Sequence, residues 1–184
     1  MSAPSLADKV LAITHALANI PHAFGGALAL AYYAEPRATV DIDLNVFVGP
    51  ERVGDVASSL AELGIAISEE AAEAVARDGQ ARVWWDRTPI DLFFAYDPFH
   101  EAAASKTRVV PFSDATIPIL AVDHLVVCKA VYNRPKDWVD IDAILELGTP
   151  VDGAEVLRWV GRIAGDDDPR YERIATVLTR PAPR

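Results

Sequence analysis

Several residue types on which whole classes of protein depend are scarce in this sequence. It has one cysteine, Cys128, and therefore cannot form an internal disulfide. Its four histidines show none of the spacings that zinc sites require. Lysine and arginine together number 17 against 27 aspartates and glutamates, so the formal net charge is −10. A charge of that sign argues against a protein that binds nucleic acid by general electrostatic attraction.

Long hydrophobic runs are also missing. No stretch is long enough to cross a bilayer, and the residues from Met1 to Asp8 lack the basic region of a signal peptide. We therefore expect a cytoplasmic protein that makes no use of a membrane. With 51% apolar and 24% charged residues, the composition is that of an ordinary globular chain with a buried core.

The order of the expected elements indicates an α+β protein with a helical end. Apolar residues alternate with polar ones in several short segments, as in strands, and these are mixed with segments of helical period. After Asp123 only helical segments follow. We predict a core over residues 1–120, in which helices flank a mixed β-sheet, and a C-terminal helical region over residues 121–184 packed on that core. The expected strands are 40–48, 82–86, 89–96, 109–112 and 117–120, and the expected helices are 6–18, 27–33, 51–63, 69–77, 123–132, 136–147, 154–163 and 170–178.

Three aspartates form the most informative pattern in the sequence. Asp41 and Asp43 stand two residues apart on an expected strand, so their side chains project to the same face. Carboxylates that close repel each other, and a divalent cation relieves the repulsion; oxygen ligands suit Mg2+. Asp91 interrupts a second apolar strand. If the two strands are neighbours, the three carboxylates can hold two Mg2+ ions about 3.5–4 Å apart for a displacement at phosphorus.

A pair of glycines, Gly25 and Gly26, precedes an expected helix. Glycines at such a turn let the backbone approach a ligand closely, and the N–H groups at a helix start favour a phosphate. The sequence therefore predicts a phosphate-binding turn beside an acidic metal site.

Simpler explanations exist for each of these features. An Asp-x-Asp pair also occurs on solvated strand faces, and Asp91 could face water on an edge strand. A phosphatase with Asp41 as nucleophile and Asp43 as acid/base is a further alternative. Asn45 does not match that motif, and the glycine pair has no function in that mechanism.

Two ordered runs of residues resemble one known family. Gly25-Gly26, a helix, and then Arg37-x-Thr39-x-Asp41-Ile42-Asp43-Leu44 is similar to the signature of minimal nucleotidyltransferases of the DNA polymerase β-like superfamily, particularly the AbiEii and MenT-type toxin group. The run over residues 119–141, with Lys129 ahead of Arg134-Pro135-Lys136-Asp137, is similar to the helical end of that group. The resemblance covers roughly residues 23–147.

The resemblance implies a nucleotidyltransferase-like fold and a function. An NMP would pass from an NTP to an acceptor hydroxyl, which could belong to the 3′ end of a tRNA or to a small molecule, and an antitoxin protein would be a partner. It also implies roles for individual residues: nucleotide or phosphate binding by Gly25, Gly26, Arg37, Thr39 and Lys129, Mg2+ binding by Asp41, Asp43 and Asp91, and catalysis by these aspartates with Lys129.

The family often has serine where this chain has Gly26, so no hydroxyl is present there to bind phosphate. A catalytically silent module that senses a nucleotide or binds a partner is therefore the alternative function. Lys129 could instead extend its ammonium group from an apolar helix to water. Arg37 could pair with Glu35, and the charges at 134, 136, 137 and 140 could form pairs within their helix.

Overall fold

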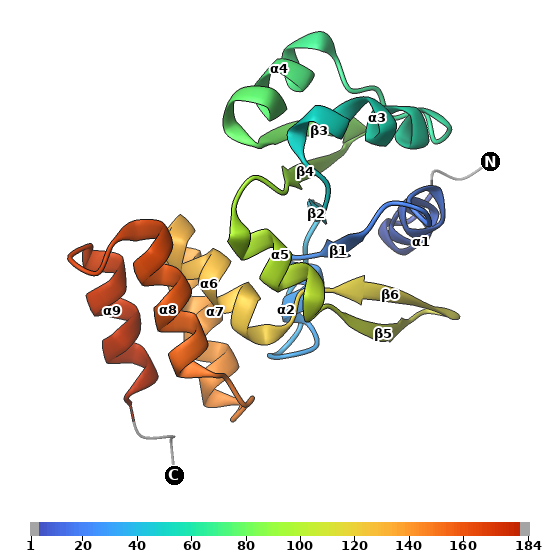
Figure 1. Ribbon diagram of the computed structural model, residues 1–184. Coiled ribbons are helices and arrows are strands. Elements are labelled where there is room, and N and C mark those ends of the chain that lie inside the picture. The colour runs from blue at the N-terminus through green and yellow to red at the C-terminus, as the bar shows by residue number, and fades with distance from the viewer. Residues whose placement is uncertain (1–3, 181–184) are drawn as a thin grey trace. The chain divides into compact units, whose positions relative to one another are not determined.

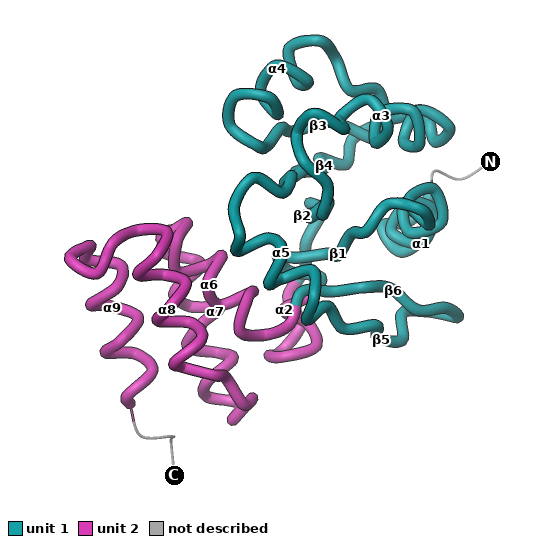
Figure 2. Tube along the Cα trace, in the orientation of Figure 1, with its two compact units in different colours: residues 1–28, 38–120 teal, residues 29–37, 121–184 magenta. Residues whose placement is uncertain are grey.

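A computed structural model of the chain describes residues 4–180 (Figure 1). The chain forms two compact units (Figure 2). The first consists of the residues up to Leu28 together with Ala38–Leu120, and the second of Ala29–Arg37 together with the residues from Ala121 onward. The helical unit thus includes a short segment from the N-terminal half of the sequence.

A six-stranded mixed sheet forms the centre of the first unit, in the order β3-β4-β2-β1-β6-β5. Its strands are β1 (His22–Phe24), β2 (Ile42–Val46), β3 (Gln80–Trp85), β4 (Thr88–Phe94), β5 (Arg108–Phe112) and β6 (Ala115–Ile119). β2 runs parallel to β4 and antiparallel to β1, and β6 runs parallel to β1. The sheet is therefore mixed, as the sequence predicted.

Strands β2 and β4 lie side by side in the interior of the sheet and supply much of its core. Ile42, Leu44, Ile90 and Leu92 are fully buried. The residues between them on each strand point to the other face, because side chains alternate along a strand. Asp43 and Asp91 occupy these intervening positions and are only partly buried.

Helices cover this sheet, and their ends follow from local sequence. They are α1 (Leu6–Ala16), α2 (Gly26–Leu30), α3 (Val53–Ala61) after the 3₁₀ turn η1 (Pro50–Arg52), α4 (Glu69–Asp78) and α5 (Pro98–Ser105). Ser5 and Asp8 form a capping box at the start of α1. Gly79, with φ of 69°, ends α4 in the left-handed conformation that glycine adopts without strain. Helix α4 packs on β3 and α1 on β6 (Figure 1).

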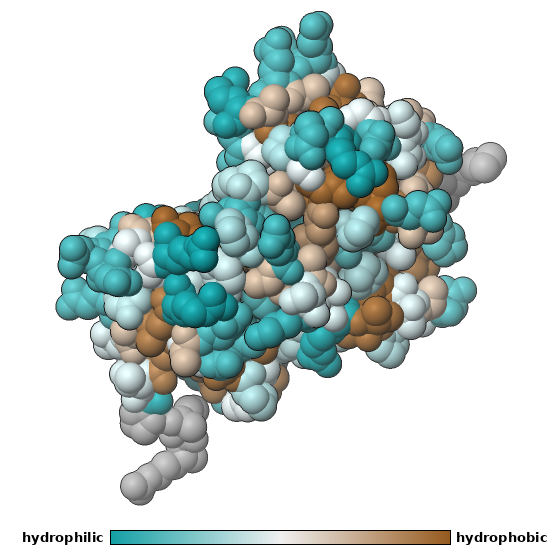
Figure 3. Space-filling view, in the orientation of Figure 1, coloured by the Kyte–Doolittle hydropathy of each residue, from teal (hydrophilic) through white to brown (hydrophobic). Residues whose placement is uncertain are grey.

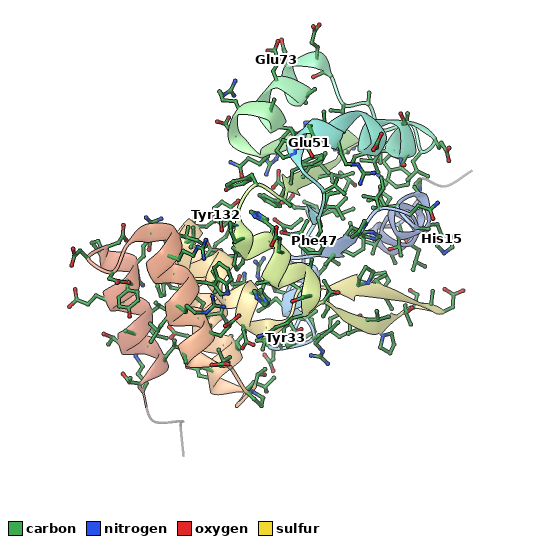
Figure 4. The ribbon with its side chains drawn as sticks, in the orientation of Figure 1. His15, Tyr33, Phe47, Glu51, Glu73 and Tyr132 are labelled. Atoms are coloured by element: carbon green, nitrogen blue, oxygen red, sulfur yellow. The ribbon has the colours of Figure 1, made fainter. Side chains whose placement is uncertain are left out.

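The second unit is built from helices α6 (Val122–Tyr132), α7 (Pro135–Glu146), α8 (Gly153–Ala164) and α9 (Pro169–Leu178). Asn133 ends α6 at φ of 57°, and its side chain accepts a hydrogen bond of 2.7 Å from Trp138 Nε1. The segment from Ala29, near the end of α2, to Arg37 belongs here as well. Tyr33, labelled in Figure 4, is buried, and its carbonyl accepts a hydrogen bond of 2.7 Å from Thr149.

The structure differs from the sequence prediction at several element ends. Helix α5 was not predicted, although Asp97 and Pro98 are a recognisable start: the Asp97 carboxylate accepts from the Phe99 N–H at 2.8 Å. The helix expected over 27–33 ends at Leu30, and the one expected over 51–63 divides into η1 and α3. The strand expected over 40–48 is shorter, so Asp41 lies just before β2.

The face of the molecule drawn in Figure 3 is largely polar. Hydrophilic residues dominate the face in Figure 3, with hydrophobic ones in small separate areas. Large exposed apolar side chains such as Val109 and Val139 are spread over different elements. Of the helices within residues 4–180, none has the length and apolar character needed to cross a membrane.

Candidate active site

Two of the predicted carboxylates are neighbours across the sheet. β2 and β4 run parallel with Asp43 directly opposite Asp91. Residues paired in this way project to the same face of a sheet, so the two side chains lie next to each other. The expectation that the strand of Asp91 lies beside the strand of Asp43 is thereby met.

The backbone of Asp41 is held by Thr39. The Asp41 N–H donates to Thr39 Oγ1 at 3.2 Å, and the Thr39 hydroxyl can donate in return to the Asp41 carbonyl at 3.3 Å. This local turn places Asp41 at the entrance of β2, two residues before Asp43. The structure thus gives Thr39 a positioning function, and its contact with a nucleotide stays a prediction.

The glycine turn is attached to the same strand. The Gly25 N–H donates to the Asp43 carbonyl at 2.9 Å, which continues the pairing of β1 with β2. Because that N–H is used within the sheet, phosphate binding by this turn would fall to the N–H groups from Gly26 onward. Asn45 is buried below the turn: a Cβ on Gly25 would lie 3.0 Å from Asn45 Nδ2.

Gly26 has both of the features that make glycine necessary. Its φ is +50°, and an added Cβ would overlap Asp43 Oδ2 and lie 2.5 Å from Asp43 Cγ. A serine here would be strained and would also displace the Asp43 carboxylate. In this chain the carboxylate of Asp43 thus fills the space that a side chain at position 26 would need.

Arg82 is the cation that faces these aspartates, and the sequence analysis did not single it out. Arg82 lies directly opposite Asp91 in the antiparallel pair β3–β4. Its guanidinium donates to both carboxylate oxygens, from Nε to Oδ1 at 2.6 Å and from Nη2 to Oδ2 at 2.7 Å. The hydrogen bond to Asp91 and the charge of Asp91 raise the pKa of Arg82, and the charges of Asp41 and Asp43 act in the same direction.

The donor atoms fit a hard divalent cation. Asp41, Asp43 and Asp91 offer only carboxylate oxygens, which suit Mg2+, and all three act electrostatically on Arg82. Across residues 4–180, however, no three acidic, histidine or cysteine side chains already converge tightly enough to coordinate a metal. Since both oxygens of Asp91 accept hydrogen bonds from Arg82, a metal ion at Asp91 would compete with a guanidinium of the same sign of charge.

Lys129 and Arg37 belong to the helical unit, where both bind one aspartate. Lys129 Nζ donates to Asp140 Oδ2 at 2.6 Å, and Arg37 donates to Asp140 from Nε at 3.1 Å and Nη2 at 3.0 Å. The side chains of Lys129 and Asp140 are each only 5% exposed. The Lys129 ammonium is therefore buried rather than extended to water, and Arg37 pairs with Asp140 rather than with Glu35.

Burial raises the pKa of Asp140, but the hydrogen bonds from Arg37 and Lys129 outweigh this effect and lower the pKa overall. Asp140 is thus a charged centre that holds two of the predicted nucleotide-binding cations. Of the pairs expected within a helix, Arg134 with Asp137 is present, with Nε–Oδ2 at 2.7 Å. The pair expected between Lys136 and Asp140, four residues apart, is replaced by the bonds of Asp140 to Arg37 and Lys129.

The structure thus places Gly25, Gly26, Thr39 and the three aspartates in the first unit, with Asp43 opposite Asp91 across the sheet. It brings Arg37 and Lys129 together in the second. Asn45, Arg82 and Asp140 were missed or left as ordinary structural residues by the sequence analysis. A buried asparagine on a strand and an arginine at a cross-strand position carry no local signal, because their function depends on which strands become neighbours.

Comparison with known proteins identifies the family of the chain. Residues 9–181 match the family described as nucleotidyl transferase AbiEii toxin, type IV toxin–antitoxin system. The chain belongs to this family, and it is a nucleotidyltransferase. No curated protein matches the sequence.

Two solved structures with a similar fold are both of ANT(2'')-Ia. One is a solution structure of this antibiotic-resistance factor, with a TM-score of 0.53 and 16% identity, covering 94% of this chain and 90% of that one. The other is a crystal structure in complex with adenylyl-2''-tobramycin, with a TM-score of 0.52 and 16% identity, covering 95% of this chain and 97% of that one. At this identity the likeness shows that the fold is shared.

Proposed function

We propose that this nucleotidyltransferase is Mg2+-dependent and moves an NMP from an NTP to the hydroxyl group at the 3′ end of a tRNA. The observation that carries the Mg2+ dependence is the arrangement around Asp43. This carboxylate lies opposite Asp91 across two parallel strands and fills the space above Gly26 at the glycine turn. Paired carboxylates directly beside a turn with available N–H groups are what a metal-bound triphosphate requires.

In this scheme Asp41, Asp43 and Asp91 hold the metal. When bound, Mg2+ would neutralise the negative charge of the phosphates and lower the pKa of a bound hydroxyl group. Gly26 and the N–H groups that follow it would bind the phosphates. Lys129 and Arg37, each fixed by Asp140, are the proposed cationic contacts to the nucleotide.

The chemical step is an in-line displacement at the α-phosphorus. The acceptor oxygen forms a bond to phosphorus, the bond to the β-phosphate oxygen breaks, and pyrophosphate leaves. The hydroxyl proton passes to Asp91, which has been released from Arg82. The side chains contribute position and charge, since no covalent bond to the protein is needed.

A small-molecule hydroxyl is the second candidate acceptor. The net charge of −10 disfavours a long RNA surface, and ANT(2'')-Ia, which has a similar fold, has been crystallised with an adenylylated aminoglycoside. The toxin family favours the tRNA end, and its description also supports an antitoxin protein as partner. We place the enzyme in the cytoplasm, where NTPs and tRNA are present.

The test is transfer of label from each of the four α-labelled NTPs, with Mg2+, to total RNA and, separately, to an aminoglycoside. Labelled RNA of tRNA size that loses its label on removal of the 3′ nucleotide supports the proposal. Label on the aminoglycoside alone would support the second acceptor. The Asp43→Asn variant is the control and should give no product.

A catalytically silent sensor is distinguished by calorimetry and pyrophosphate release. A sensor would bind an NTP and release no pyrophosphate with any acceptor, and that result would refute the proposed activity.

A further inference from the structure

Three charged residues form a row across adjacent strands, with one cation followed by two anions. Arg82 on β3 lies opposite Asp91 on β4, and Asp91 lies opposite Asp43 on β2. Residues in register across a sheet project to one face, so the order on that face is cation, anion, anion. β3 is the outermost strand of the sheet on this side, with β4 its only hydrogen-bonded neighbour.

The Arg82–Asp91 pair has the geometry of a strong but movable interaction. Two parallel N–H···O bonds of 2.6 and 2.7 Å use both oxygens of Asp91, which is the arrangement in which arginine binds a carboxylate best. The Arg82 side chain is nevertheless 52% exposed, whereas that of Asp91 is 23% exposed. An arginine does not lose its proton at any pH of interest, so this ion pair opens by rotation of a side chain, and the more exposed Arg82 is the freer of the two to move.

The pair also opposes the function proposed for Asp91. A metal ion and the guanidinium would bind the same carboxylate and carry charge of the same sign. Without a metal, Arg82 reduces the repulsion between Asp91 and Asp43; with a metal present, Arg82 would itself be repelled.

We infer that Arg82 is an exchangeable counter-ion, which occupies Asp91 in the metal-free protein and competes there with a divalent cation. The inference rests on the proposed metal function of the aspartates. It assigns Arg82 as a positioning residue that sets the metal concentration at which the site assembles. Arg82 would contact neither the acceptor nor the reacting phosphorus in this function.

Mn2+ binding measured by electron paramagnetic resonance tests the inference without any catalytic turnover. The proteins are wild type, Arg82→Gln and the matched control Arg52→Gln. Arg52 is 48% exposed and bound to Asp55 at 2.9 Å, so its loss removes one charge and one comparable ion pair. Removal of a competing pair of this exposure should tighten Mn2+ binding by up to roughly fivefold in Arg82→Gln, whereas Arg52→Gln should bind like wild type.

The Asp91→Asn background separates exchange at Asp91 from a general effect of charge. If Arg82 acts by occupying Asp91, the change from Arg82 to Gln should have no further effect on Mn2+ affinity once the carboxylate is gone. If Arg82→Gln tightens Mn2+ binding equally in the wild-type and the Asp91→Asn background, the inference is overturned. The positive charge of Arg82 would then act on the metal ion from a distance, without any exchange at Asp91.

A second measurement follows stability. In metal-free buffer Arg82→Gln should melt at a lower temperature than wild type, because the carboxylates lose their counter-ion, and Mn2+ should raise its melting temperature more than it raises that of wild type. Equal Mn2+-induced shifts in the two proteins would contradict the inference.

The outcomes also separate this inference from the proposed function. If Mn2+ binds and Asp43→Asn abolishes that binding, while Arg82→Gln binds like wild type, the metal site stands and the exchange is refuted. If no variant binds Mn2+, with or without a non-hydrolysable NTP analogue, both the metal site and the exchange are refuted.

Discussion

The turn at Gly26 allows a quantitative prediction, because two separate costs meet at one position. In Gly26→Ala the new residue must adopt φ near +50°, which costs an L-residue about 1–2 kcal/mol. The added Cβ also overlaps Asp43 Oδ2 and lies 2.5 Å from Asp43 Cγ, and overpacking of this kind costs about 1–3 kcal/mol. We expect the free energy of unfolding to fall by about 2–5 kcal/mol in total.

Rotation of the Asp43 side chain could relieve part of the overlap, but that movement would take the carboxylate out of its present place. The variant should therefore lose transfer activity and Mn2+ binding whether or not the side chain rotates. The Cβ would in any case lie 3.1 Å from Asp43 Cβ, which rotation does not change. The measurements are urea denaturation and label transfer from an NTP.

Gly64→Ala is the matched control. Gly64 has φ of +78° and nothing within 4 Å of an added Cβ, so this variant has only the backbone cost of about 1–2 kcal/mol. The double variant Gly26→Ala/Asp43→Ala should recover most of the stability lost through overlap, which a double-mutant cycle measures. If Gly26→Ala is no less stable than Gly64→Ala and keeps its activity, the carboxylate of Asp43 does not lie against this turn.

Three further predictions concern charged groups. Asp43→Ala should abolish transfer yet keep or raise the melting temperature in metal-free buffer, because it removes one of several repelling carboxylates; a large fall would show a structural role instead. Lys129→Met should lower the free energy of unfolding by about 1–3 kcal/mol, since it removes a charged partner from a buried carboxylate, and should also weaken NTP binding; unchanged stability and binding would leave Arg37 as the remaining cationic candidate. Asp140→Asn should lower the free energy of unfolding by about 3–5 kcal/mol, because the Lys129 ammonium stays buried without its countercharge. The lowered pKa of Asp140 adds stability above the ordinary value of 3.8, and this stability is lost as pH falls through the folded pKa, so acid titration of wild type should show a loss that Asp140→Asn lacks.

The sequence was sufficient where the signal is local. The alternation around Asp43 predicted a strand, and the apolar run around Asp91 predicted another. Helix α5 was missed although Asp97 and Pro98 mark its start, and the exact ends of α2 and β2 were displaced by a few residues. The ends of helices and strands depend on packing and on local turns such as the one between Thr39 and Asp41. These features leave no periodic pattern in the sequence.

The motifs of the sequence alone determined the kind of protein: a mixed α+β nucleotidyltransferase with an ordered series of glycine, aspartate and lysine positions. Only the tertiary structure decided which of these residues meet. The parallel pairing of β2 with β4 makes Asp43 and Asp91 neighbours, and the antiparallel pairing of β3 with β4 adds Arg82 to them. In the helical unit, folding places the Lys129 ammonium on Asp140. The physical reason is that strand order and register are set by long-range burial and hydrogen bonding between segments far apart in the sequence, whereas periodicity and turn motifs report only on residues a few positions apart.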